Sequence, residues 1–149
     1  MLERLSLKQA FDKIENSLQF VTNATIAYIN SIDITYVSCE YCSAGVATGS
    51  CKTHGINFGQ YRLLYNLEIH LEQEGGKILA TGFDNIGTHL FGMDASSLIK
   101  RKEDDPDAFN KVFTDTVQKK YELRLSYAII VDEDSDKNEV KCTINSIDI

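Results

Sequence analysis

Residues 60–83, with the sequence QYRLLYNLEIHLEQEGGKILATGF, decide the fold class of this chain. Over residues 60–72, apolar and polar side chains alternate. The apolar row contains Tyr61, Leu63, Tyr65, Leu67, Ile69 and Leu71, and the polar row contains Arg62, Asn66, Glu68 and His70. A repeat of two residues is typical of a β-strand that buries one face. The QEGGK segment then predicts a hairpin turn, and residues 77–83 predict the returning strand.

Segments on both sides extend this β pattern. Residues 18–37 are rich in β-branched and aromatic side chains and predict one long strand, or two strands separated by a bend. Residues 121–132 and 138–149 predict two further strands that are joined by an acidic loop. The chain is therefore expected to contain five main strands.

Three other segments predict helices. Residues 6–17 form the first, with Ser6 as the expected N-cap. The apolar face of this helix contains Leu7, Ala10, Phe11 and Ile14. Residues 85–102 predict short helical pieces broken by glycine, and residues 104–120 predict a helix that begins near Pro106.

This order of elements predicts the fold. Five strands with a helix between the third and the fourth is the order of an OB-fold, a partly open Greek-key barrel. The 149 residues are the size of one ordinary domain, and they contain no internal repeat and no low-complexity linker. We therefore expect a mainly β protein, a single five-stranded OB-fold domain over residues 1–149 with flanking helices and a small insert at residues 38–58.

Composition excludes several classes of protein. The net charge of −7 argues against a general nucleic-acid coat, which needs many Lys and Arg contacts to phosphate, although it leaves room for a narrow basic track. No run of about 18 apolar residues is present, so we expect no membrane span. The N-terminus lacks the apolar core of a signal peptide. Four cysteines in a chain without an export signal indicate a reducing compartment.

Three of the four cysteines gather in residues 39–54, CEYCSAGVATGSCKTH, together with one histidine. Cys39 and Cys42 form one pair with two residues between them, and Cys51 and His54 form a second. Such spacing aims two side chains at one ion, and thiolate and imidazole donors suit tetrahedral zinc. We therefore predict one structural Zn²⁺ that is held by these four residues in an inserted zinc ribbon.

Other interpretations of this cluster are weaker. A disulfide leaves an odd cysteine and gives His54 no role. A redox Cys-x-x-Cys pair is typical of a helix start, whereas Cys39 follows a predicted strand. Catalytic zinc keeps an open position for water, and a zinc deaminase needs a glutamate two residues after the clustered histidine, where this chain has Ile56. No nucleophile–base motif or phosphate loop is present, so we expect no enzyme.

A zinc ribbon inserted after the first strand of an OB-fold is unusual, and further motifs accompany it. They are Tyr61–Arg62 after the two ligand pairs, Thr81-x-Phe83 at the end of the return strand, AFNKVF at residues 108–113 and VKCTINSIDI at residues 140–149. With these motifs the chain resembles, from about Phe20 to Ile149, the C-terminal DNA-binding domain of the large subunit of replication protein A (RPA).

The chain departs from that family's pattern at four places. The fourth metal ligand is His54 where the family has cysteine, and Leu79 stands in place of an aromatic residue. Only Arg124 remains of several basic residues in the strand after the helix, and an acidic loop replaces an aromatic near the last hairpin. These departures suggest a specialised paralogue, similar to the RPA-like large subunits among telomerase accessory proteins.

The resemblance implies a nuclear protein that binds single-stranded DNA in telomere maintenance or in DNA replication and repair. It also implies partners, namely the other subunits of an RPA-like complex, telomerase among them. OB-folds hold single strands by stacking bases on aromatic side chains and by Lys and Arg contacts to phosphates. Phe83 is the stacking candidate because it matches the family's motif. The cationic candidates are Arg62, Arg124, Lys52, Lys77 and Lys141.

Two alternatives stay open at this point. In the first, Phe83 belongs to the core and the basic residues form a solvated surface. In the second, the domain is an interaction module that assembles an RPA-like heterotrimer with little DNA contact. We expect Cys142 to be buried and His70 and His89 to be structural or surface residues. The aromatic residues expected in the core are Tyr61, Tyr65, Phe109 and Phe113.

Overall fold

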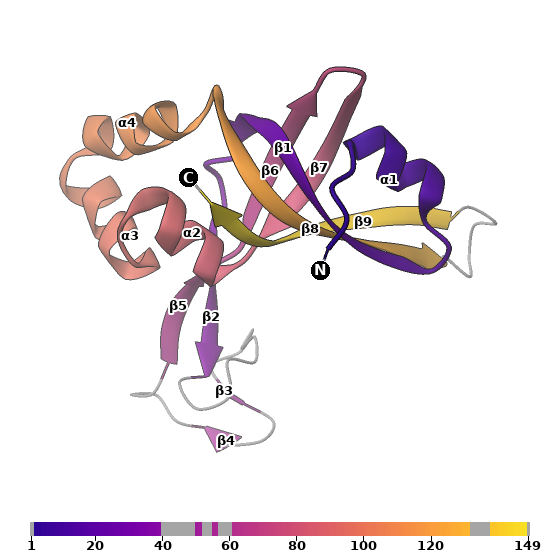
Figure 1. Ribbon diagram of the computed structural model, residues 1–149. Helices are drawn as coiled ribbons and strands as arrows, with labels where there is room; N and C mark the ends of the chain where they lie inside the picture. The colour runs from indigo at the N-terminus through magenta and orange to yellow at the C-terminus, as the bar shows by residue number, and fades with distance from the viewer. Residues whose placement is uncertain (1, 40–49, 52–54, 57–60, 132–137, 149) are drawn as a thin grey trace.

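The computed structural model describes residues 2–39, 50–51, 55–56, 61–131 and 138–148. In chain order the elements are α1 (Leu7–Lys13), β1 (Ser17–Ile29), β2 (Thr35–Cys39), β3 (Ser50–Cys51), β4 (Gly55–Ile56), β5 (Tyr61–Tyr65), β6 (Leu67–Gln73), β7 (Gly76–Gly82), α2 (Asp84–Phe91), α3 (Ala95–Asp104), α4 (Pro106–Thr116), β8 (Lys119–Val131) and β9 (Asn138–Asp148). Figure 1 shows α1 on one side of the strands and α2, α3 and α4 on the other.

Five strands close into a barrel in the order β1–β6–β7–β9–β8, and β8 pairs again with β1. Neighbouring strands are antiparallel except β7 and β9, which run parallel. The prediction of a mainly β domain with a five-stranded barrel and flanking helices is thereby confirmed. Within the described segments, no helix is both long and apolar enough to cross a membrane.

Alternation of side chains builds the core of the barrel. In β6, Leu67, Ile69 and Leu71 are buried, whereas Glu68 and His70 between them are exposed. The largest fully buried side chains elsewhere in the barrel include Phe20, Ile26, Leu123, Leu125 and Tyr127. Each such side chain contributes about 1.5–3 kcal/mol when it leaves water, so the strands settle with their apolar rows inward.

The segment that the sequence presents as one strand, residues 60–72, is two strands that meet at Asn66. The backbone N–H of Asn66 donates to the carbonyl of Ile34 at 2.8 Å. Before this point β5 pairs with β2, and after it β6 pairs with β1. The change of partner interrupts the strand, and β2 and β5 project from the barrel as a separate pair (Figure 1).

The predicted insert begins at the end of this β2–β5 pair. Cys39, the last residue of β2, pairs with Tyr61. A second short pair joins Ser50 to Ile56 and Cys51 to Gly55. Most of residues 38–58 lie outside the described part of the chain, so the zinc ribbon and its boundaries stay a prediction.

Helix α1 lies against the barrel beside the β6–β7 hairpin. Ser6 caps it as predicted, because its hydroxyl accepts from the N–H of Gln9 at 3.0 Å and the Gln9 side chain accepts from the N–H of Ser6 at 2.9 Å. The N–H of Leu7 donates to Oε1 of Gln73 at 2.8 Å, and the Leu7 carbonyl accepts from Oη of Tyr127 at 3.2 Å. These bonds fasten the helix to two strands.

The prediction for α1 is wrong in two respects. The helix ends at Lys13 rather than at residue 17, and Phe11 is 56% exposed instead of buried. Successive helical residues are separated by about 100°. A helix of seven residues buries only Leu7 and Ala10 here, and Phe11 lies beyond the edge of that narrow face.

Helices α2, α3 and α4 pack together on the opposite side. Gly92 ends α2 in the left-handed region, with φ of 70°, and Pro106 begins α4 as predicted. The rings of Phe91 and Phe109 each lie 5.0 Å from the ring of Phe113. The predicted burial of Tyr65, Phe109, Phe113 and Cys142 is confirmed, and the side chain of Tyr61 is outside the described part.

Candidate nucleic-acid interface

The outer face of β7 carries a row of exposed side chains. Leu79 is 47% exposed, and Phe83, which follows the strand, is 40% exposed. Between these positions Ala80 and Gly82 are buried, as the two-residue repeat of a strand requires. An exposed leucine and phenylalanine on one strand face form a surface on which flat apolar rings can stack.

Phe83 is held in place through its backbone. It occupies the N-cap position of α2, where its carbonyl accepts from the N–H groups of Ile86 and Gly87, both at 3.0 Å. Its side chain makes no capping hydrogen bond. The ring is therefore partly accessible to a ligand, while the junction of strand and helix fixes the backbone that carries it. The alternative that Phe83 is a core residue does not agree with its exposure.

Strands β9 and β8 continue this surface. Gly82 pairs with Ile144, so the next residues, Phe83 and Asn145, lie side by side on the outer side. Ala80 pairs with Cys142, which places exposed Lys141 next to Leu79. We call the outer side of β7, β9 and β8 the barrel wall.

Arg124 belongs to the same barrel wall. It pairs with Ser146 on β9, one residue beyond Asn145, and its side chain is exposed. Lys141 pairs with Ala128 farther along β8. The structure therefore brings three of the predicted residues, Phe83, Arg124 and Lys141, onto one surface.

A β-bulge at Asn145 fixes the position of this residue beside Phe83. The pairing register of β8 and β9 shifts between Arg124 and Leu125, which leaves Asn145 without a partner residue. Its Nδ2 donates to Oγ of Ser126 at 2.5 Å, and its carbonyl accepts from Nδ2 of Asn85 at 3.0 Å. Sequence reasoning missed Asn145, although asparagine is uncommon inside strands and such a position is a signal for a bulge.

Three other predicted residues are not brought to this group. Lys77 begins the same row of β7, but it lies six positions before Phe83, which is about 20 Å along a strand. Arg62 pairs with Ser38 in the β2–β5 pair, and its side chain is outside the described part. Lys52 also lies outside the described residues.

The outer row of β6 differs in charge from the barrel wall. It consists of Glu68, His70 and Glu72, which are all exposed. The ring of His70 lies edge-on to Tyr28 of β1, with centroids 5.3 Å apart. The carboxylates of this row repel phosphates, so a nucleic acid strand is expected to lie on the β7–β9–β8 side of the barrel.

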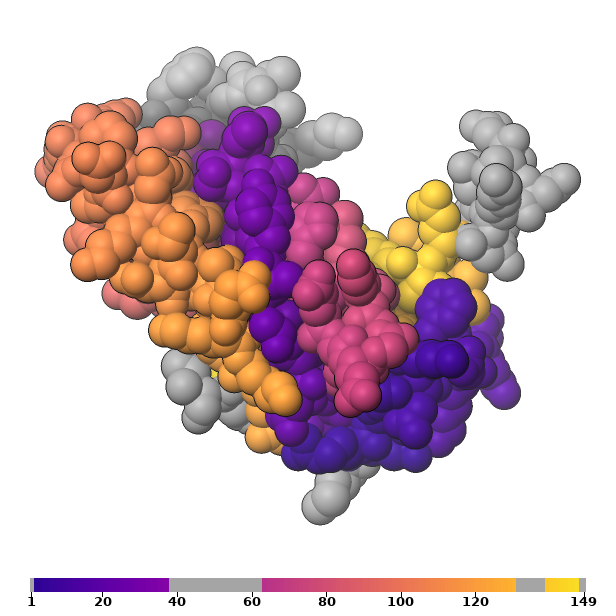
Figure 2. Space-filling view, turned by 90° about the horizontal axis from the view of Figure 1, so that it is seen from above, coloured from indigo at the N-terminus to yellow at the C-terminus, as the bar shows by residue number. Residues whose placement is uncertain are grey.

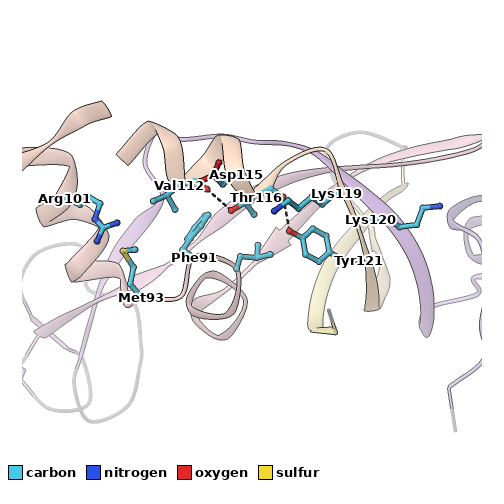
Figure 3. Close-up of a pocket in the computed structure, with 10 residues that line it drawn as sticks. Phe91, Met93, Arg101, Val112, Asp115, Thr116, Lys119, Lys120 and Tyr121 are labelled. Carbon is cyan, nitrogen blue, oxygen red and sulfur yellow. Dashed lines mark hydrogen bonds between the residues drawn. The ribbon is translucent and has the colours of Figure 1, made fainter. Parts of the chain in front are cut away.

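Another described hollow lies elsewhere, between the helices and the start of β8 (Figure 3). Its volume is about 450 Å³, and Phe91, Val112 and Tyr121 are among its lining residues. Two of its polar groups are used within the fold. Oγ of Thr116 donates to the Val112 carbonyl at 2.7 Å, and Oη of Tyr121 donates to the Thr116 carbonyl at 3.0 Å. Burial raises the pKa of the Tyr121 phenol, which keeps this donor protonated.

The predicted metal ligands are only partly within the described residues. Cys39 ends β2 and Cys51 ends β3, while Cys42 and His54 lie outside. Across the ranges that the structure describes, no three metal-ligating side chains gather at one point. Cys51 pairs with Gly55.

The fold and the barrel wall define a class of protein, an OB-fold-like barrel with an exposed aromatic and cationic surface. The family model of the replication factor-A C-terminal domain matches residues 19–149, and the chain belongs to this family. Replication factor A protein 1 of Saccharomyces cerevisiae is 25% identical over 135 residues. The match covers 86% of this chain and 21% of that relative, so the chain spans about a fifth of the relative's length.

Two solved structures share the fold. A replication protein A heterotrimer bound to single-stranded DNA matches with a TM-score of 0.84 and 23% identity, over 99% of this chain and 36% of that chain. Yeast RPA bound to single-stranded DNA matches with a TM-score of 0.79 and 22% identity, over 100% of this chain and 89% of that chain.

Proposed function

We propose that this chain is a single-stranded DNA-binding OB-fold domain of an RPA-like large subunit. The observation that carries the proposal is the barrel wall, where exposed Phe83 lies beside Asn145 and where Arg124 and Lys141 face the same side. A base stacks on the Phe83 ring while neighbouring phosphates contact the two cations. Binding of this kind needs no catalytic group, and the domain acts as a binding module rather than as an enzyme.

The solved relatives support this proposal and suggest the partners of the domain and its location in the cell. Both solved relatives were determined with single-stranded DNA bound, and one of them is a heterotrimer. We therefore propose single-stranded DNA and the other subunits of an RPA-like complex as partners, in the nucleus. For the process that it serves, we propose either telomere maintenance, with telomerase as a partner, or general replication and repair.

Salt dependence tests the cationic part of this interface. We expect the double variant Arg124→Ala/Lys141→Ala to weaken single-strand binding for all sequences alike. The slope of log affinity against log salt should flatten by about 0.7 for each phosphate contact that is lost. Fluorescence anisotropy titrations at several salt concentrations measure this slope.

The control for charge is Lys100→Ala/Lys111→Ala, which removes two exposed lysines from α3 and α4. We expect this variant to keep the slope of the unmodified protein. Equal slopes for both double variants would show that the barrel wall is not the interface.

We also propose that Cys39, Cys42, Cys51 and His54 hold one structural Zn²⁺. Their donor set and spacing fit a tetrahedral site, and when bound the ion would link the end of β2 to the β3–β4 pair. The four ligands leave no open position for a substrate, so the metal serves folding rather than chemistry.

Metal analysis tests this site. We expect one zinc per chain in protein purified without chelators, and loss of zinc in Cys39→Ser. Cys142→Ala is the matched control because Cys142 is buried in β9, away from the cluster, and this variant should keep its metal. Chelation should reduce the order of residues 38–58 and leave the barrel folded, since the described core lies outside this segment. Zinc-free protein from such a preparation would overturn the proposal.

A second candidate function is an interaction module with little DNA contact. The observation in its favour is charge, since the chain carries a net charge of −7 and the β6 row next to the barrel wall contains Glu68 and Glu72. The two functions differ in one measurable property, which is affinity for a single strand at low salt.

A further inference from the structure

Helix α1 exposes an aromatic side chain that the fold itself does not use. Phe11 is 56% exposed, although the helix is fastened on both sides by hydrogen bonds from Leu7 to Gln73 and from Tyr127 to Leu7. These bonds hold the backbone of α1, so the helix presents Phe11 at a defined place on the surface, where an exposed aromatic ring can stack on a flat ligand. α1 also lies outside residues 19–149, which the family model matches.

A hollow of about 270 Å³ lies between α1 and the tip of the β6–β7 hairpin. Phe11 and Ile78 provide its apolar surface, and Lys8 and Lys77 provide two cations. Figure 2 shows α1 beside this hairpin tip. Gly75 leaves open space at the turn, because a Cβ at this position would meet no atom within 4 Å. A hollow that is lined by an aromatic ring and two lysines is complementary to a nucleotide, which has a flat base and an anionic phosphate.

This hollow continues onto the exposed outer side chains of β7. Lys77 and Ile78 also line a second hollow, of about 230 Å³, together with Leu79. Lys77 is accessible to an anion, since its side chain is 83% exposed and its ion pair with Glu72 is long, at 4.0 Å. The β7 row therefore connects the α1 hollow at one end with Phe83 at the other, about 20 Å apart.

We propose that Phe11, Lys8 and Lys77 form a second single-strand contact site, in which a base stacks on Phe11 and its phosphates meet the two lysines. The single-stranded DNA follows β7 from Phe83 to α1. Only an oligonucleotide long enough to cover the distance between Phe83 and Phe11 therefore reaches both contact sites. This inference rests on the proposed function and adds an end point to the path of the strand. It also assigns to Lys77 a role apart from the Phe83 group.

A length series tests the proposal on the full chain. Labelled oligothymidylates of about 4, 8 and 12 nucleotides, within the range of site sizes for OB-folds, are titrated with the unmodified protein, Phe11→Ala and Lys8→Ala/Lys77→Ala. We expect both variants to bind the shortest strand normally and the longest strand more weakly. For Phe11→Ala the loss should be about 5- to 150-fold, the range for loss of one stacked base. Ile32→Ala is the control, because Ile32 is 70% exposed and lies outside both hollows.

Cross-linking gives a second measurement that is independent of affinity. A strand of about 12 nucleotides with 5-iodouracil at one end, within the OB-fold range, should cross-link to the peptide that contains Phe11. If Phe11→Ala and Ile32→Ala bind all lengths alike and no cross-link falls on α1, the second site is refuted. The proposed function still stands in that case if the shortest strand binds in a manner that depends on Phe83. It fails only if the unmodified protein binds none of the three strands.

Discussion

Alanine in place of Phe83 should weaken single-strand binding about 5- to 150-fold, which corresponds to about 1–3 kcal/mol for one lost stacking contact. The melting temperature should change little. The side chain is 40% exposed, and the capping interactions of this residue use its backbone carbonyl, which alanine retains. Affinity and thermal unfolding are measured on the same preparation.

Two further variants separate stacking from packing at this position. Phe83→Tyr keeps the ring and should bind nearly as the unmodified protein does. Phe109→Ala removes a phenylalanine that is 3% exposed and should cost about 3–5 kcal/mol of unfolding free energy. If Phe83→Ala resembles Phe109→Ala, with a large drop in melting temperature and unchanged affinity per folded molecule, Phe83 belongs to the core.

Tyr65→Ala should cost about 3–5 kcal/mol of unfolding free energy, as for other buried aromatic residues. Tyr65 is fully buried at the junction of β5, α2 and the segment before α3. Its backbone N–H donates to Oδ1 of Asp84 at 3.2 Å, and its hydroxyl donates to the Met93 carbonyl at 3.0 Å. A Cβ at Gly87 would lie 2.3 Å from its ring, so α2 packs directly on this side chain.

Loss of this ring should also reduce DNA affinity, because α2 and its N-cap residue, Phe83, lose their support. Chemical denaturation measures the stability, and hydrogen exchange of α2 reports the local effect. Tyr65→Phe is the control; it removes only the hydroxyl and should cost about 0.5–1.5 kcal/mol. Burial raises the pKa of this phenol, so the bond to Met93 persists at neutral and mildly alkaline pH. A cost below that of Tyr65→Phe would show that α2 does not depend on the ring.

The strands were predictable because they obey a two-residue repeat. Leu67, Ile69 and Leu71 are buried as this repeat requires, and the glycine-containing turn that follows forms at Gly75, with φ of 81°. The break at Asn66 was not predictable, since the apolar row continues through it. What ends β5 there is a change of pairing partner, which is a tertiary property and leaves no mark on a local repeat.

The failure at α1 has a different cause. Phe11 fits a helical apolar face, but how much of that face is buried depends on the surface that receives it. In this structure only Leu7 and Ala10 of α1 are buried. Periodicity reports which residues share a side of a helix, and it does not report the width of the contact.

The structure groups some of the predicted site residues and separates others. Phe83, Arg124 and Lys141 were identified from the family's motif or from their charge, and the structure places all three on the barrel wall. Lys77 was assigned to the same groove, although it lies at the far end of β7. The parallel pairing of β7 with β9 determines which residues become neighbours, and register between strands distant in sequence cannot be derived from one chain.

The most direct measurement is an anisotropy titration of a labelled single strand of about 12 nucleotides at low salt, with unlabelled single-stranded and duplex DNA as competitors. We predict saturable binding that the single strand displaces and the duplex does not, that weakens as salt is added, and that falls sharply in Phe83→Ala. No change in anisotropy at low salt, with folded and metal-loaded protein, would contradict single-strand binding and leave the domain as an interaction module.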